Sequence, residues 1–129
     1  MNDLIIEPRD KTPGIDFSYG ILLFHGRSLV EEPKAFFEPV FAWVKKYIKQ
    51  PAATTVISIK LEYIDSKSTH ALFEIFKLME CILKKEAVLM INWYYAYGDI
   101  EMLELGEIIQ GRLETEFEFN EFRPDISKY

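Results

Sequence analysis

The sequence predicts a single α/β domain over residues 1–129, in which three main helices cover a mixed β-sheet mainly on one face. Two kinds of periodicity support this fold class. Alternating apolar and polar residues mark half-buried strands, and apolar residues at three- and four-residue spacing mark amphipathic helices. The segments follow the order β-β-β-α-β-α-β-α-β, and strands joined through a helix pair in parallel, by a right-handed crossover. We expect one such crossover over residues 54–95.

Three short strands are expected before the first helix. Leu4–Glu7 is β-like, and Pro13-Gly14 marks the turn that follows it. Residues 15–24 are rich in β-branched and aromatic side chains. The interruption at Tyr19-Gly20 therefore predicts a hairpin, which we expect to end at Gly26.

The first helix is expected to open at Pro33, because proline suits a first turn, where its missing N–H would lack a partner anyway. Pro39 lies early in the same segment and predicts a kink or a later start near Glu38. Gln50-Pro51 stops the helix. Its apolar face comprises Phe36, Phe37, Val40, Phe41, Val44 and Ile48.

The clearest strand runs from Thr54 to Ile64. Its alternation indicates a sheet with one face packed under helices and the other partly wet. Ile57, Ile59, Leu61 and Tyr63 are predicted to point one way, and Ser58, Lys60 and Glu62 the other. Val88–Tyr95 is nearly all apolar and predicts a central strand.

Two further helices and a last strand complete the pattern. The second helix is expected from Ser66 to Lys84 or Lys85, the third between Asp99 and Gly111, and the last strand over Glu116–Phe122. The buried stripes comprise Leu72, Ile75, Phe76, Met79, Ile82 and Leu83 in the second helix, and Met102, Leu105 and Ile109 in the third. Cys81 falls within the apolar pattern of the second helix, so we expect it to be buried.

Composition excludes several classes of partner. The net charge of −6 repels phosphate backbones, and no run of Lys and Arg forms a basic stripe, so neither nucleic acid nor an anionic membrane is expected as a partner. The single cysteine excludes an intramolecular disulfide. No signal peptide or membrane-spanning segment is recognised, which predicts a cytoplasmic location. No cofactor is expected.

The segment Tyr63–His70 carries the most chemistry. It lies where the clearest strand ends and the second helix begins, and the free N–H groups of a helix start favour a negative group. A hydroxyl there can accept a phosphate, which adds a charge of about −1.5 to −2. Asp65, Ser66 and Ser68 are also preferred capping residues, so helix capping alone is the alternative. Three hydroxyls and one carboxylate in five residues exceed what a cap requires.

Two catalytic alternatives are weaker. A hydrolase built from Ser66, His70 and Asp65 would have serine and histidine on one helix face, but no third group is identifiable to orient the histidine, and no Gly-rich oxyanion turn flanks the serine. Three glutamates of the third helix could suggest a metal site, but their spacing spreads them around the helix. They are Glu101, Glu104 and Glu107. We therefore expect a solvated acidic face and no enzymatic activity.

The aromatic run Trp93-Tyr94-Tyr95, with Tyr97 beyond it, could line a ligand pocket or a partner interface. The alternative is a strand whose large side chains fill the core on one face and reach the surface on the other. Tyr95 and Tyr97 sit at the strand end, where exposure is common, so they are candidate contact residues.

Short motifs occur in a characteristic order from Leu4-Ile5-Ile6-Glu7-Pro8 to about Phe119. They are Thr12-Pro13-Gly14, Gly26-Arg27-Ser28, Pro39-Val40 with Trp43, Lys60-Leu61-Glu62-Tyr63, Asn92-Trp93-Tyr94-Tyr95 and Met102-Leu103-Glu104-Leu105-Gly106-Glu107. Each is weak alone, but their order and spacing together are specific. Through them the chain resembles the SiaC family of biofilm-regulation phosphoproteins, relatives in fold and logic of the anti-sigma factor antagonists with STAS-type domains. The resemblance implies a STAS-like fold.

In that family the strand is followed by Asn-Thr-Ser-Ser, whose threonine accepts the phosphate. The corresponding run Asp65-Ser66-Lys67-Ser68 departs from it at three of four positions. The resemblance places the acceptor hydroxyl on Ser66, with Ser68 and Thr69 as alternatives, and Asp65-Ser66 also resembles the phosphorylated Asp-Ser pair of STAS antagonists. The expected partner-binding residues are Asp65, Ser66, Lys67, Ser68 and His70. Lys67 and the loop Leu29-Val30-Glu31-Glu32, where relatives tend to carry Tyr-Pro-Glu-Asn, are the departures that bear on recognition.

The resemblance implies a partner-switching protein of biofilm and cyclic di-GMP signalling. A histidine-kinase-like ATPase would phosphorylate it, and a metal-dependent PP2C-like serine/threonine phosphatase would reverse the modification. The unmodified form would bind and activate a diguanylate cyclase or a related effector. The alternative is a constitutive interaction scaffold of the same fold, in which the divergent acceptor segment is no longer phosphorylated.

Overall fold

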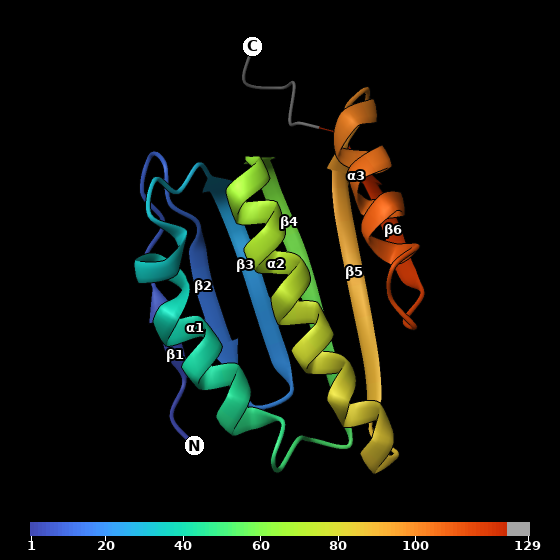
Figure 1. Cartoon of the computed structure of the whole chain (residues 1–129). Helices are drawn as coiled ribbons and strands as arrows, with labels where there is room; N and C mark the ends of the chain where they lie inside the picture. Colours follow the sequence, from blue (N-terminus) through green and yellow to red (C-terminus); the bar gives the residue numbers. More distant parts are fainter. Residues whose placement is uncertain (124–129) are drawn as a thin grey trace.

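The computed structural model describes residues 1–123 and contains one six-stranded sheet, whose strands lie side by side in chain order (Figure 1). The strands are β1 (Leu4–Ile6), β2 (Gly14–Ser18), β3 (Ile21–Ser28), β4 (Thr54–Ile64), β5 (Val88–Ala96) and β6 (Phe117–Phe122). β1, β2 and β3 pair in an antiparallel manner, whereas β3 to β6 pair in parallel. The predicted α/β class, the mixed sheet and the order of elements are confirmed.

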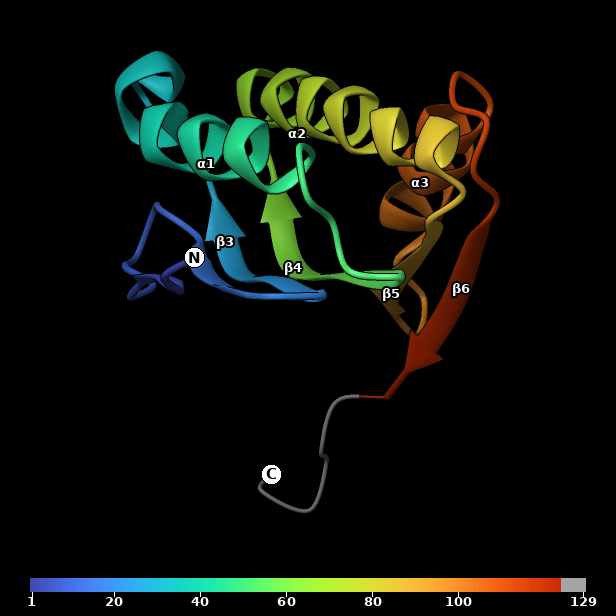
Figure 2. The same cartoon turned by 90° about the horizontal axis from the view of Figure 1, so that it is seen from below.

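Three helices cover one face of this sheet. They are α1 (Pro33–Tyr47), α2 (Ser66–Met79), which continues into the 3₁₀ helix η1 (Glu80–Lys85), and α3 (Ile100–Gln110). Figure 2 shows all three above the same face, whereas the opposite face carries no helix from the described part of the chain. Each helix joins two neighbouring parallel strands, so all three helices begin at the edge where these strands end.

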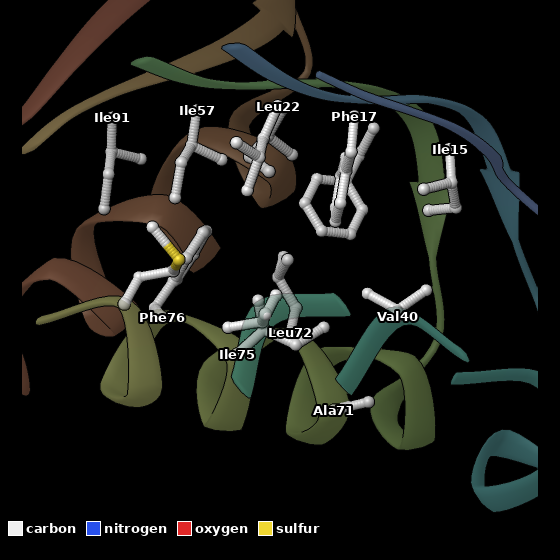
Figure 3. Close-up of a cluster of buried hydrophobic side chains, with 14 of the residues drawn as sticks. Ile15, Phe17, Leu22, Val40, Ile57, Ala71, Leu72, Ile75, Phe76 and Ile91 are labelled. Atoms are coloured by element: carbon white, nitrogen blue, oxygen red, sulfur yellow. The ribbon is translucent and has the colours of Figure 1, made fainter. Parts of the chain in front are cut away.

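The core lies between the sheet and the helices (Figure 3). Its central side chains are almost fully buried. The strands contribute Ile15, Phe17, Leu22, Ile57 and Ile91, and the helices contribute Val40, Leu72, Ile75 and Phe76. Burying one such side chain stabilises the fold by about 1.5–3 kcal/mol, so this layer holds the helices on the sheet.

Helix α3 lies directly on the sheet. The indole N–H of Trp93 on β5 donates a hydrogen bond of 2.9 Å to the carbonyl oxygen of Met102. Gly106 lies directly over the indole, where a Cβ atom would come within 2.6 Å of Trp93 Nε1 and 2.8 Å of the Phe119 ring. The missing side chain therefore permits this approach.

A single carboxylate ties the end of α2 to the loop that leads into β6. Glu80 is 8% exposed, and its Oε2 atom accepts hydrogen bonds from the backbone N–H groups of Glu114 at 2.7 Å and Thr115 at 2.8 Å. The Thr115 hydroxyl donates a third, also at 2.8 Å. Hydrogen bonds to a charged acceptor contribute about 1.5–3 kcal/mol, so this contact fixes the entry into β6.

The end of β4 departs from simple alternation. β3 does not end at Gly26 but continues to Ser28, and its register with β4 shifts between Gly26 and Arg27, which leaves Glu62 as an extra residue on β4. A bulge of this kind reverses which side chains face inward. Tyr63, predicted to face the core, is 48% exposed, and Ile64 packs against the core in its place.

Two helix predictions also need correction. α1 begins at Pro33 and contains Pro39, so a later start near Glu38 is wrong. The second helix is α-helical only to Met79, and the tighter 3₁₀ winding of η1 turns Glu80 inward and leaves Cys81 exposed, contrary to the expected burial. None of the helices within residues 1–123 has the length and apolar character needed to cross a membrane.

Gly106→Ala is expected to lower the free energy of unfolding by about 1–3 kcal/mol, because the added methyl group overlaps the Trp93 indole. Urea unfolding followed by circular dichroism measures this change. Gly111→Ala is the matched control, since its φ is −62° and the nearest atoms to a Cβ there lie at 3.5 Å. The control should stay within about 0.5 kcal/mol of the parent. Equal losses in both variants would contradict the close seating of α3.

Candidate regulatory site at the start of helix α2

The candidate site lies at the edge of the sheet where β4 ends and α2 begins (Figure 1). Asp65 is the N-cap of α2, and Ser66 is its first helical residue. The start of α3 lies at the same edge, capped by Asp99, whose Oδ1 atom accepts from the Met102 N–H at 3.1 Å. Parallel strands carry their carboxyl ends to one edge, which is where α/β folds place binding sites.

Asp65 fixes the junction on two sides. Its backbone is extended, with φ −85° and ψ 174°, and its Oδ1 atom accepts a hydrogen bond of 2.8 Å from the Ser68 N–H. Its own backbone N–H donates to the carbonyl oxygen of Ser28, at the end of β3, at 2.9 Å. The helix start is therefore tied both to its first turn and to the neighbouring strand.

The three hydroxyls of this segment have different environments. Ser66 is exposed. Ser68 is 1% exposed. Thr69 is half-buried, and its hydroxyl donates to the Asp65 carbonyl oxygen at 2.8 Å. Of the three, Ser66 therefore presents the hydroxyl that another protein can reach in this conformation.

Ser68 belongs to the interior. Its Oγ atom and that of Ser28 are buried and have no hydrogen-bond partner within the described part of the chain. Both residues line a small cavity with about 190 Å³ of empty space, no part of it wide enough for a water molecule, next to Phe24, Phe37 and Leu72. The Ser68 side chain faces the interior in this conformation, and a partner contact through Ser68 stays a prediction.

Two hollows of opposite character flank Ser66, and both Ser66 and Thr69 line each of them. The first measures about 390 Å³, and its charged lining residues are Glu62, Asp99 and Glu101. The second measures about 240 Å³, lies between α2 and α3, and is lined by His70 and Arg112 together with Phe73, Leu105, Ile108 and Ile109. The exposed hydroxyl thus stands between an acidic and a basic surface.

The arrangement does not resemble a catalytic centre. His70 is exposed, and within residues 1–123 no hydrogen bond joins it to Ser66 or to a carboxylate. Nucleophilic catalysis needs a base that is held toward the nucleophile. The same residues contain no group of three or more His, Cys, Asp or Glu side chains placed to hold a metal ion. A reachable hydroxyl on a charged surface suits modification and recognition.

The aromatic run divides between core and surface. Trp93 is fully buried and Tyr95 packs against the core, whereas Tyr97 is 60% exposed, with the Arg123 guanidinium 4.2 Å from its ring centroid. Tyr94 has the Lys60 ammonium 4.8 Å from its ring. A partner contact through Tyr95 or Tyr97 stays a prediction.

Sequence reasoning missed the contribution of α3 to the site. Asp99 was expected only to precede a helix, Glu101 to lie on a solvated face, and Arg112 had no assigned role. The available signal was spacing, because Leu105, Ile108 and Ile109 lie on one side of the helix and Arg112 follows in the turn directly after it. Only the strand order, however, brings that side of α3 next to α2.

An α/β domain with an exposed serine at a capped helix start offers a surface that suits recognition by other proteins. The comparison with known families makes this specific, since residues 6–122 match the model of the SiaC family regulatory phosphoprotein. The chain belongs to the SiaC family. The resemblance seen in the short sequence motifs is confirmed, whereas the likeness to STAS-type domains stays a prediction.

Relatives occur in Pseudomonas aeruginosa. An uncharacterized protein of strain UCBPP-PA14 is 27% identical over 109 residues, which cover 83% of this chain and 86% of the relative. The structure of SiaC superimposes with a TM-score of 0.81 at 24% identity, over 96% of this chain and 100% of that one. A chain of the crystal structure of the diguanylate cyclase SiaD in complex with its activator SiaC gives 0.85 at 23% identity, over 93% and 100%. At these identities the structures show a shared fold.

Asp65→Ala is expected to lower the free energy of unfolding by about 1 kcal/mol, because the Ser68 N–H loses its capping acceptor. Thermal or urea unfolding measures the loss, and faster amide exchange at Ser68 locates it. Asp65→Asn keeps an acceptor oxygen at the same position and should recover most of the stability. If alanine and asparagine were equally destabilising, charge and not capping would be the cause.

Proposed function

We propose that this protein is a cytoplasmic partner-switching regulator that is reversibly phosphorylated on Ser66 and that, when unmodified, binds and activates a diguanylate cyclase. The observation that carries the proposal is the environment of the hydroxyls: Ser66 is exposed, whereas Ser68 is buried and Thr69 is bonded to the backbone. Membership of a family of regulatory phosphoproteins supports it.

In the phosphoryl transfer this protein positions the Ser66 hydroxyl, and the partner enzymes supply the catalytic groups. A histidine-kinase-like ATPase presents ATP, the Ser66 oxygen attacks the γ-phosphorus, and ADP leaves with the electron pair of the broken bond while the hydroxyl proton passes to a base of the kinase. A PP2C-like phosphatase reverses the state: metal-activated water attacks the phosphorus, and the Ser66 oxygen leaves and regains a proton. An exposed hydroxyl on a rigid helix start suits both enzymes.

The phosphate changes the surface through its charge. It adds about −1.5 to −2 beside the Asp65 carboxylate and at the rim of a hollow that already carries three acidic side chains. A partner that covers the bare junction would have to bury this charge without a counter-charge, which costs several kcal/mol. Phosphorylation therefore releases the effector.

A diguanylate cyclase is the proposed effector because of one solved complex. The crystal structure with the TM-score of 0.85 contains the diguanylate cyclase SiaD with its activator SiaC, and the present chain covers the whole length of the chain it matches there. We assign the contact surface to Ser66 and its neighbours Asp65, Lys67 and His70. Lys67 and His70 are exposed, and Asp65 is half-buried.

Incubation with the cognate kinase and ATP is expected to place one phosphate on the chain, on the tryptic peptide that contains Ser66. Ser66→Ala should abolish the labelling, because the neighbouring hydroxyls are enclosed or bonded. Peptide mass spectrometry measures the site. Thr54→Ala is the matched control, since it removes an exposed hydroxyl at the opposite end of β4 and should label normally. Efficient labelling of Ser68 or Thr69 in the intact protein would move the site.

The same variants test the switch. Unmodified protein and Ser66→Ala should bind and activate the cyclase, and the phosphorylated protein should bind at least ten-fold more weakly, which corresponds to about 1.4 kcal/mol. The constitutive scaffold is the second candidate, and the divergence of Asp65-Ser66-Lys67-Ser68 from the family segment favours it. Equal cyclase binding by phosphorylated and unmodified protein would select the scaffold.

A further inference from the structure

A groove lies between α2 and α3, beside Ser66. On α2 it is lined by Ser66, Thr69, His70 and Phe73, and on the α3 side by Leu105, Ile108, Ile109 and Arg112. The α2 residues have the spacing i, i+3, i+4, i+7 and form one side of that helix. Leu105, Ile108 and Ile109 lie on one side of α3, and Arg112 lies in the turn that follows it. The hollow beside Ser66 is therefore a groove that runs along both helices.

The groove between the two helices stays open because α3 packs against the sheet and not against α2. α2 packs beside α1, whereas α3 packs on β5 and β6. The side chains between α2 and α3 consequently stay accessible, and Ile108 is 60% exposed. The floor is apolar; among the described lining residues Arg112 carries a charge, His70 offers a further nitrogen donor, and none is a carboxylate.

A phosphate on Ser66 has two directions open to it. Toward β4 and the start of α3 it would meet the acidic hollow, and toward the groove it would meet the basic residues. His70 lies one helical turn after Ser66, a spacing at which helix side chains are neighbours, and an imidazole N–H can donate to a phosphate oxygen. Arg112 keeps its charge at every relevant pH. Electrostatics therefore favours the groove.

We propose that His70 and Arg112 form an intramolecular receptor for the Ser66 phosphate, which then lies over the α2–α3 groove and covers its apolar floor. This inference rests on the proposed phosphorylation of Ser66 and adds where the phosphate goes. A solvated dianion over the floor residues Leu105 and Ile108 prevents an apolar partner surface from entering the groove. The phosphate thus acts by occlusion as well as by charge repulsion.

The test uses full-length protein with phosphoserine incorporated at position 66 during translation, so it does not depend on any kinase. The second pKa of the phosphate, about 6 in phosphoserine, is followed by ³¹P NMR titration at low salt. The titratable groups that line the two hollows beside position 66, or adjoin it in the chain, are Glu62 of β4, the N-cap Asp65, Lys67 and His70 of α2, Asp99 and Glu101 at the start of α3, and Arg112 after it.

Arg112→Gln should raise this pKa by up to about half a unit, because a positive neighbour favours the dianion. His70→Ala should also raise it, because a hydrogen bond donated to the phosphate favours the dianion. The arginine effect should shrink in 0.5 M salt, in line with screening. Lys77→Gln is the control, since it removes an exposed positive charge about 16 Å further along α2 and should leave the pKa unchanged.

Comparing the phosphate pKa in Glu101→Gln and Arg112→Gln shows whether the phosphate lies over the groove or in the acidic hollow. A phosphate over the groove should respond more to Arg112→Gln than to Glu101→Gln, and a phosphate in the acidic hollow should respond in the opposite order. The second order, or no response to Arg112→Gln, overturns the inference while leaving phosphorylation of Ser66 intact. Failure of the kinase to label Ser66 would instead count against the proposed function, so the two failures are distinguishable.

Discussion

The parallel pairing of β3, β4, β5 and β6 in chain order is the constraint on which the rest of the structure depends. The sheet grows in one direction and all three connecting helices lie on one face, so the three crossovers have the same hand (Figure 2). Every helix then begins at the same edge, and this brings the start of α2 next to the start of α3. The location of the candidate site is therefore set by the strand order of the sheet, and the individual side chains determine its chemistry.

At the start of α2, the Asp65 cap fixes where the helix begins, and the helix then determines which serine side chain is exposed. The Asp65 carboxylate accepts from the Ser68 N–H and starts α2 at Ser66. In the helix that follows, Ser68 lies on the buried face with Leu72 and Ile75, whereas Ser66 is exposed. The Asp65 backbone at the same time anchors the junction to β3. Helix capping and a regulatory role are therefore compatible explanations of residues 65–69, because the capped helix start holds the exposed Ser66 side chain in a fixed position.

Local periodicity predicted much of the fold. The bounds of β4 and the start of α2 at Ser66 agree with the structure, because long alternating and helical patterns are strong signals. Tyr63 and Cys81 were placed wrongly, since a register shift against β3 and a change to 3₁₀ winding depend on neighbours that no local pattern shows. The basic side of the site was missed for a related reason, because Arg112 lines the same hollow as Ser66 only through the tertiary placement of α3.

The seating of α3 on Trp93 has a consequence for how such chains diverge. An acceptor on the outside of a helix can change between threonine and serine without disturbing the packing, whereas position 106 has no space for any side chain while the indole remains beneath it. Mutations should thus accumulate at the exposed start of α2 sooner than at Trp93 and Gly106. In very remote homologues, we therefore expect the pair formed by Trp93 and Gly106 to be retained longer than the residues at the start of α2.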